Sequence, residues 1–370
     1  MYINGDGTRK AVGHHRLAPP PAGASPDYRV ADVGCLPETG PEIAVVIPTF
    51  NRPERCAVLL ASLSRQTLPP ARFEVIVVDD CSTEAEDPVA TLKALAPDLP
   101  YRLQVLQTRS NRGPGPARNV GWRAATAPLV AFTDDDCRPE AGWLEAGLTH
   151  LQAHPEVGVA QGRTRPPDGV DVHQLQGWYV WRVIPAPSPY FDACNVFFRR
   201  RALDRAGGFD EEIGWWPSFG WPGAVPVAWG EDTAAAWAVI EDGWDRGFVA
   251  DAVVIHEVEW RGLWWHVKYG YLDRVIVALA AAHPGYRREA FWRRWAYRRE
   301  DAAFSLAVAG LVAATRWRPA ALAVAPYLWW RRPSLRKPNF VPTCLGYVAV
   351  DTARAAGRLS GAIKYRTLVL

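Results

Sequence analysis

The sequence has few cysteines, no signal-peptide pattern and no long apolar run. Its six cysteines are scattered without a CxxC pair, so they predict neither a zinc knot nor a disulfide framework, and we expect a reducing, cytoplasmic location. The N-terminal part is rich in Gly, Pro and polar groups, without the basic and apolar regions of a signal peptide, so we expect a flexible tail over 1–41. We found no internal repeat.

Composition places the chain among folded proteins. It has 370 residues, of which 49% are apolar and 22% are charged, which excludes global disorder and collagen-like or disulfide-scaffold classes. The net charge of +3 is unevenly distributed. Between Arg261 and Phe340, 15 Lys and Arg face four acidic residues, an excess of +11 that leaves −8 for the remainder. This predicts an acidic body that binds a cation or a cation-masked ligand, and a basic part that meets an anionic surface or is a solvated face.

Strand and helix patterns alternate from Ile43 onward. Expected strands lie at 43–47, 73–78, 103–106, 129–133, 157–161, 195–199 and 248–255. Expected helices begin near Pro53 and lie at 88–95, 116–125, 139–153, 201–206 and 231–240. The first strand is apolar throughout, as expected for a strand buried on both faces. The alternation predicts an α/β fold with a mostly parallel sheet whose ligands bind at the carboxyl ends of the strands.

Two acidic clusters follow expected strands. Asp134-Asp135-Asp136 could bind a hard cation such as Mg²⁺ or Mn²⁺ beside substrate phosphates, and Asp79-Asp80 could accept hydrogen bonds from a base or a ribose. The alternative for both clusters is helix capping or a solvated turn.

The segment 111–119 combines Gly, Pro and Arg before an expected helix, so Arg112 or Arg118 could meet a phosphate. It lacks the third glycine of a dinucleotide fingerprint. Later in the chain, Glu231 and Asp232 near a helix start have the placement that a general base needs. His256 follows a strand and could complete a metal shell, or be a structural histidine.

Taken in order, these segments resemble family 2 glycosyltransferases over residues 42–258. The motifs that carry the resemblance are 46–52 (VIPTFNR), 77–83 (VVDDCST), 111–121 (NRGPGPARNVG), 132–136 (FTDDD), 195–199 (NVFFR), 207–211 (GGFDE) and 230–232 (GED). The resemblance implies a GT-A fold and an inverting transfer of a sugar from a nucleotide-diphosphate donor, with Mn²⁺ or Mg²⁺ as cofactor.

The resemblance also implies roles for single residues. Those that match the nucleotide-sugar contacts are Pro48, Thr49, Phe50, Arg52, Asp79, Arg118, Asp134 and Asp135. Asp136 matches the direct metal ligand, Asp134 a second ligand position or a ribose contact, and His256 a metal-binding histidine that follows the base by two dozen positions. Asp232 matches the general base, with Glu231 as the alternative.

An aromatic loop precedes the expected base. Its tryptophans, Trp215, Trp216, Trp221 and Trp229, could pack on the apolar face of an acceptor sugar; the alternative is that several of them are core residues. Cys81 stands where the family commonly has Gly or Asn, and no Gln-x-x-Arg-Trp follows Asp232, so a non-processive enzyme is expected. Rival functions are a metal-dependent nucleotidyltransferase and a catalytically silent sugar-nucleotide-binding protein.

Residues 259–370 form a basic, Trp-rich extension that we expect to be helical. Its apolar stretches, Ala302–Ala314 and Pro319–Trp330, are separated by Arg316 and Arg318, and each is shorter than the roughly 20 residues that cross a bilayer. We expect peripheral association with the inner face of the cell membrane. A soluble helical cap or a homodimer interface is the alternative. The expected acceptor is a glycan or a lipid-linked carrier, and no nucleic-acid partner is expected.

Overall fold

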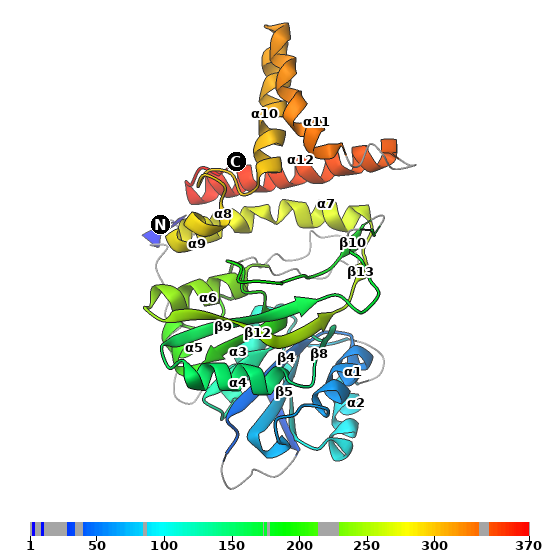
Figure 1. Cartoon of the computed structure of the whole chain (residues 1–370), viewed down its shortest axis with the longest axis vertical. Helices are drawn as coiled ribbons and strands as arrows, with labels where there is room; N and C mark the ends of the chain where they lie inside the picture. The colour runs from blue at the N-terminus through cyan, green and yellow to red at the C-terminus, as the bar shows by residue number, and fades with distance from the viewer. Residues whose placement is uncertain are drawn as a thin grey trace. The chain divides into compact units, whose positions relative to one another are not determined.

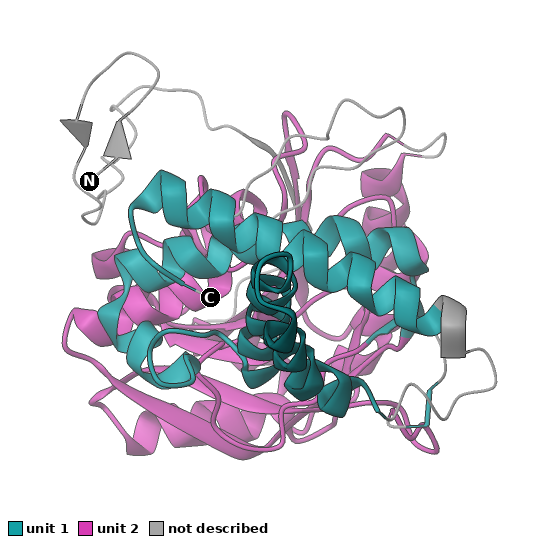
Figure 2. Cartoon of the chain, turned by 90° about the horizontal axis from the view of Figure 1, so that it is seen from above, with its two compact units in different colours: residues 1–13, 174–180, 259–370 teal, residues 14–173, 181–258 magenta. Residues whose placement is uncertain are grey.

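We describe a computed structural model of the chain. It describes residues 40–83, 87–172, 174–175, 178–213, 229–332 and 340–369, the last with side chains from Thr343, together with the backbone of short strands at 2–3, 9–10 and 28–33. The chain divides into two compact units, residues 14–173 with 181–258, and residues 1–13 with 174–180 and 259–370 (Figure 2). We call them the sheet unit and the helical unit.

The sheet unit is built on a nine-stranded mixed sheet, counted over the described residues (Figure 1). In chain order its strands are β3 (Tyr28–Val33), β4 (Ile43–Thr49), β5 (Phe73–Asp79), β6 (Arg102–Thr108), β7 (Leu129–Phe132), β8 (Cys137–Pro139), β9 (Val157–Arg165), β11 (Val196–Arg199) and β12 (Asp245–His256). Their order across the sheet is β3-β6-β5-β4-β7-β11-β9-β12-β8. Strands β6, β5, β4 and β7 are mutually parallel neighbours, so their carboxyl ends lie along one edge of the sheet.

Helices cover both faces of this sheet. Along β4, Ile43, Val45 and Ile47 pack with α1 (Pro53–Leu63), α2 (Pro88–Leu95) and α4 (Trp143–Ala153). The intervening residues Ala44 and Val46 pack on the other face with α3 (Pro114–Ala124), α5 (Arg200–Ala206) and α6 (Glu231–Glu241). Because alternate strand residues point to opposite faces, the apolar run of β4 fills two cores at once. The predicted α/β fold is confirmed.

Helix α3 lies unusually close to the sheet. A Cβ added at Gly121 would lie 2.4 Å from Cγ1 of Val46, a distance that real side chains do not show. Glycine therefore lets the helix approach β4, and the same helix carries Arg118 towards the strand ends.

The helical unit contains six helices among its described residues. They are α7 (Leu263–Tyr271), α8 (Asp273–Ala282), α9 (Pro284–Ala290), α10 (Arg299–Ala314), α11 (Ala325–Arg331) and α12 (Phe340–Tyr365), with a 3₁₀ segment, η4 (Arg318–Val324), between α10 and α11. The unit also holds the strand pairs β1 (Tyr2–Ile3) with β2 (Arg9–Lys10) and β10 (Tyr179–Val180) with β13 (Glu259–Trp260). Of the helices that can be described, none is both long enough and apolar enough to span a membrane.

Three local expectations differ from the structure. Within the expected tail, Tyr28–Val33 forms β3 and pairs antiparallel with β6. The helix expected from Pro139 begins at Trp143, because the chain first forms β8 and the Glu140 amide then donates to the Val253 carbonyl. The stretch Pro319–Trp330 is split between η4 and α11, since Pro326 has no amide hydrogen to continue the hydrogen-bonding pattern.

Candidate active site

Contacts of Asp134-Asp135-Asp136, which we call the second acidic cluster, join the end of β7 to the end of β4. Thr49, the last residue of β4, donates its hydroxyl hydrogen to Oδ2 of Asp135 at 2.8 Å. The Arg52 guanidinium, just before α1, lies 3.3 Å from Oδ1 of Asp135 and 3.6 Å from Oδ2 of Asp136. Burial raises the pKa of Asp135 to about 7, against the lowering effect of Arg52. The structure thus brings four of the predicted site residues together at one edge of the sheet.

Arg118 connects this cluster with the start of α6. The buried guanidinium donates from Nη2 to Oδ1 of Asp134 at 2.7 Å and from Nη1 to Oε1 of Glu231 at 2.8 Å. Burial lowers the pKa of Arg118, and the carboxylates of Asp134 and Glu231 raise it by more. The cation predicted to meet phosphate therefore holds two carboxylates, one from each side of the predicted site.

Glu231 and Asp232 occupy the first turn of α6, which begins after Gly230 in a left-handed conformation (φ 87°). Oε2 of Glu231 is buried and has no hydrogen-bond partner within the described residues. Asp232 accepts hydrogen bonds from the amides of Ala193 at 3.1 Å and Thr233 at 2.7 Å. Burial, together with the charge of Glu231, raises the pKa of Asp232 to about 7. A carboxylate with a pKa near neutrality suits a general base.

Asp136 and His256 face one another across β8 and β12. Nδ1 of His256 lies 2.7 Å from the carbonyl oxygen of Glu257, so Nδ1 must carry a hydrogen and donate it. The other ring nitrogen, Nε2, lies 3.6 Å from Oδ1 of Asp136. A ring nitrogen and a carboxylate oxygen at this separation can share a cation, either a proton on the ring or a metal ion.

The donor set fits a divalent metal. Ligand atoms of Asp136, Cys137 and His256 all lie within 4.8 Å of one another. Carboxylate oxygen suits Mn²⁺, and neutral imidazole is a common metal ligand. A metal-bound histidine usually donates its other ring N–H to a carbonyl or carboxylate, as Nδ1 of His256 does to Glu257. Burial raises the pKa of the Cys137 thiol well above its usual value, so its sulfur is protonated and is a weak ligand.

Asp79 and Asp80, which we call the first acidic cluster, accept hydrogen bonds from nearby residues of the protein. The Asp79 carboxylate accepts hydrogen bonds from the amide and hydroxyl of Ser82 and from Nε2 of Gln107, and the residue has no exposed surface. Asp80 accepts from the amides of Arg112 and Gly113. Contact between Asp79 and a nucleotide base would require one of these bonds to be exchanged.

The remaining predicted residues lie at or near the same edge. Pro48 is buried within β4, Phe50 is partly buried directly after it, and Trp229 is partly buried before Gly230. The other three predicted acceptor tryptophans, Trp215, Trp216 and Trp221, lie outside the described residues.

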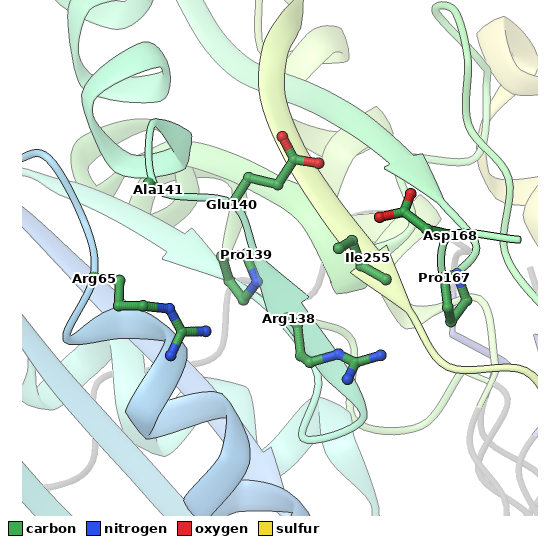
Figure 3. A pocket seen from close by; sticks show the side chains of 8 residues that line it. All are labelled: Arg65, Arg138, Pro139, Glu140, Ala141, Pro167, Asp168 and Ile255. Atoms are coloured by element: carbon green, nitrogen blue, oxygen red, sulfur yellow. The ribbon is translucent and has the colours of Figure 1, made fainter.

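A cavity of about 540 Å³ lies elsewhere in the sheet unit (Figure 3). Its lining residues are Arg65, Arg138, Pro139, Glu140, Ala141, Pro167, Asp168 and Ile255. Consecutive strand residues point to opposite faces, so Ile255 faces away from its neighbour His256. Arg165 forms ion pairs with Glu140 and Asp168 at 2.7 and 2.6 Å. The two acids that line the cavity are thus already paired, and none of the predicted site residues lines it.

Sequence reasoning missed the residues behind Asp232. The Asp192 carboxylate raises the pKa of Asp232 and forms an ion pair with Nε of Arg182 at 3.2 Å. Both lie in a loop-rich segment without periodicity, so no local pattern marks them. Cys137 was missed as well, although its place directly after three aspartates was a usable signal.

Residues 44–207 match the model of the family described as glycosyl transferase family 2. This segment of the chain is similar to that family, as its motifs predict. The chain has a fold like that of a mannosyltransferase from Pyrobaculum calidifontis, solved in complex with GDP-Man and Mn²⁺, with a TM-score of 0.54, 21% identity and coverage of 87% of both chains. The predicted GT-A architecture is confirmed.

Two curated relatives give the scale of the similarity. The chain is 28% identical over 264 residues to the pre-mycofactocin glycosyltransferase of Mycobacterium tuberculosis, which covers 67% of this chain and 50% of the relative. It is 40% identical over 181 residues to the uncharacterized glycosyltransferase YwdF of Bacillus subtilis, which covers 46% of this chain and 63% of the relative. The chain thus spans about half the length of the first of these relatives.

Proposed function

We propose that the glycosyltransferase domain transfers a sugar from a nucleotide-diphosphate donor to a hydroxyl group, with inversion at the anomeric carbon. The observation that carries this proposal is the Arg118 guanidinium, whose two terminal nitrogens bind Asp134 at the end of β7 and Glu231 at the start of α6. One rigid cation thereby holds the donor-side and acceptor-side carboxylates within reach of a single substrate. The P. calidifontis enzyme of similar fold, with GDP-Man and Mn²⁺ bound, supports a nucleotide-sugar donor.

In the proposed reaction, Asp232 accepts the proton of the acceptor hydroxyl as its oxygen forms a bond to the anomeric carbon. The bond from that carbon to the diphosphate oxygen breaks, and its electron pair leaves with the diphosphate. Attack from the face opposite the leaving group inverts the configuration. Asp136 and His256 would hold Mn²⁺ or Mg²⁺, which supplies positive charge to the leaving diphosphate when bound. Buried Glu231 Oε2 is available to a substrate hydroxyl.

The proposal extends to the setting of the reaction. We propose a non-processive enzyme that acts on a glycan or a lipid-linked acceptor at the inner face of the cell membrane. The uneven charge of the chain supports this placement, since the basic residues concentrate in residues 261–340.

Asp232→Asn tests the proposed base. A panel of nucleotide sugars with Mn²⁺ or Mg²⁺, screened by ligand-induced shifts in melting temperature, first identifies the donor. We expect the variant to keep the donor-induced shift and to lose about 10²- to 10⁴-fold in rate of sugar transfer. Asp242→Asn, the same change at the other end of α6, is the matched control and should retain the wild-type rate.

The pH dependence gives a second readout. A base with a pKa of about 7 is protonated at lower pH, so the rate should fall roughly tenfold for each pH unit below 7 and level off above it. If Asp232→Asn loses donor binding but transfers sugar from bound donor at the wild-type rate, Asp232 is not the base. Donor cleavage by nucleotidyl transfer, or binding without turnover, would favour the rival functions.

A further inference from the structure

The hairpin formed by α10, η4 and α11 has an apolar outer surface. We define the hairpin as residues 302–332; it extends away from α12 within the helical unit (Figure 1). Its exposed apolar residues are Leu306, Val308, Leu311, Val312, Trp317, Leu322, Leu328, Trp329 and Trp330, with Leu322 77% and Val312 64% exposed. A helix exposed to water normally has a polar outer face, and contiguous apolar surface of this kind marks an interaction site.

The inner contact of the hairpin uses small residues. Ala303 and Ala307 are buried, and a Cβ added at Gly310 would lie 2.5 Å from the Cβ of Ala323. Small residues that let two backbones approach closely are typical of helix pairs in lipid. The exposed large residues, such as Leu311 and Leu322, are directed away from this contact.

The base of the hairpin is attached by polar contacts. The Tyr327 hydroxyl donates to Oδ2 of Asp351 on α12 at 2.6 Å, and the Arg331 guanidinium forms an ion pair with the same carboxylate. Phe304 is buried with Tyr327 and Ala355. Because these contacts already hold the hairpin on α12, its exposed residues, such as Leu311 and Leu322, are not needed for that attachment.

The charge of the hairpin has one sign. Residues 302–332 contain four arginines, Arg316, Arg318, Arg331 and Arg332, and no acidic residue. The Arg332 guanidinium lies 3.7 Å from the ring centre of exposed Trp329. Arginine beside tryptophan at the edge of an apolar surface is the composition of segments that enter the headgroup region of anionic bilayers.

We propose that this hairpin inserts into an anionic lipid bilayer and attaches the protein to it. A second copy of the chain fits the surface less well, since two such faces would bring Arg316, Arg318 and Arg332 against the same three arginines, and residues 302–332 hold no carboxylate to pair with them. Anionic headgroups supply the missing negative charge, and the acyl region accepts the apolar residues. This attachment is independent of sugar transfer.

Flotation of the full chain with vesicles tests the proposal without any donor or acceptor. We expect the protein to float with vesicles of phosphatidylglycerol and phosphatidylcholine, to stay behind with phosphatidylcholine alone, and to float less as ionic strength rises. The double variant Leu311→Asn/Leu322→Asn should lower vesicle partitioning on the order of 10-fold. Arg316→Gln and Arg318→Gln should each lower it about fivefold.

Val58→Asn on α1 is the matched control, an exposed aliphatic residue of another helix, and should float like the wild type. Circular dichroism checks that each variant is folded. If Leu311→Asn/Leu322→Asn does not fold, the two arginine variants still test the proposal. Equal flotation of the wild type with both vesicle types, or of wild type and hairpin variants, would overturn the proposal. So would a lipid-free dimer that Leu311→Asn/Leu322→Asn converts to monomer.

Discussion

Asp79 ends β5 and Asp80 follows it, while Asp134 to Asp136 follow β7; only β4 lies between these two parallel strands. The carboxylates of the first pair accept hydrogen bonds from amides, a hydroxyl and a side-chain amide of nearby loops. Those of the second cluster face the guanidinium groups of Arg52 and Arg118 and the ring of His256. The first cluster closes turns, whereas the second faces two guanidinium groups and an imidazole ring.

The difference shows how two acidic strand ends can be told apart. A carboxylate whose oxygens accept neutral N–H and O–H groups has completed its bonding within the protein. Asp136 instead lies 3.6 Å from a guanidinium nitrogen of Arg52 and 3.6 Å from Nε2 of His256, so its partners are groups that carry or bind positive charge. The donors around an acid are therefore more informative about metal binding than the number of acids in the motif.

Replacing Arg118 should have the largest effect, because the second cluster depends on its charge. Arg118→Met removes the partner of both Asp134 and Glu231 and leaves the buried Glu231 carboxylate without its cation, so we expect the free energy of unfolding to fall by about 4 kcal/mol. Urea denaturation measures this. Arg112→Met, which breaks the exposed ion pair to Glu211, should cost less than about 1 kcal/mol. Equal losses would show that the two arginines play equivalent roles.

Replacing Asp136 should weaken metal-dependent binding of the donor. In Mn²⁺, we expect Asp136→Asn to weaken donor binding about 100-fold or more, since changes behind a metal ligand already cost 10- to 100-fold. Calorimetric titration in Mn²⁺ and in a chelator provides the measurement, and the difference from wild type should vanish in the chelator. Asp80→Asn, at the first cluster, is the matched control and should bind donor like the wild type.

Replacing Asp80 should affect stability. Asp80→Ala leaves the amides of Arg112 and Gly113 without their acceptor, and we expect a loss of about 2 kcal/mol in the free energy of unfolding. Asp80→Asn keeps an acceptor oxygen and should lose less. Chemical denaturation at constant pH compares the two, and a larger loss in Asp80→Asn would contradict the assigned contacts.

The same position gives a pH test. Burial raises the pKa of Asp80 to about 6 from a usual value of 3.8, so the folded state binds a proton more tightly than the unfolded state. Its contribution to stability is present below about pH 4 and is lost as the pH rises to about 6. Asp80→Asn cannot ionise, and its stability should fall less than that of the wild type over this interval.

The smallest effect is expected at Thr49. Thr49→Val removes the hydroxyl that donates to Asp135, and we expect a loss of about 1 kcal/mol in the free energy of unfolding. Thr91→Val, which removes an exposed hydroxyl bonded to the carbonyl of Asp87, should cost less. Thermal unfolding of both variants measures the difference, and indistinguishable curves would argue against a structural part for the Thr49 contact.

The sheet was predictable where the chain is apolar without interruption. The run in β4 and the acids after β5 and β7 could be placed from the sequence, because burial and strand ends are local properties. Strand β8 was missed, since its three residues pair with β12, which lies more than a hundred positions away. In an isolated sequence, Pro139 reads equally well as the start of a helix.

The site was predictable as a set of residues and less so as a set of contacts. The motifs predict that four residues act together: Asp134, Asp136, Asp232 and His256. Their joint role in sugar transfer remains a proposal. The link from Arg118 to Glu231 spans 113 positions, and the hydrogen bond that orients His256 uses a backbone carbonyl. Neither contact leaves a local pattern, because one depends on the packing of α3 and the other has a backbone carbonyl as its acceptor.

The pairing of His256 with Cys137 gives the smallest strand of the sheet an unusual importance. Strand β8 is an edge strand of three residues, too short for its own ladder to specify alignment strongly. A shift by one position would turn Asp136 away from the imidazole. A metal ion bound by Asp136 and His256 would therefore favour one alignment of β8 with β12. Amide hydrogen exchange in β8 would then be slower with the metal bound than without it.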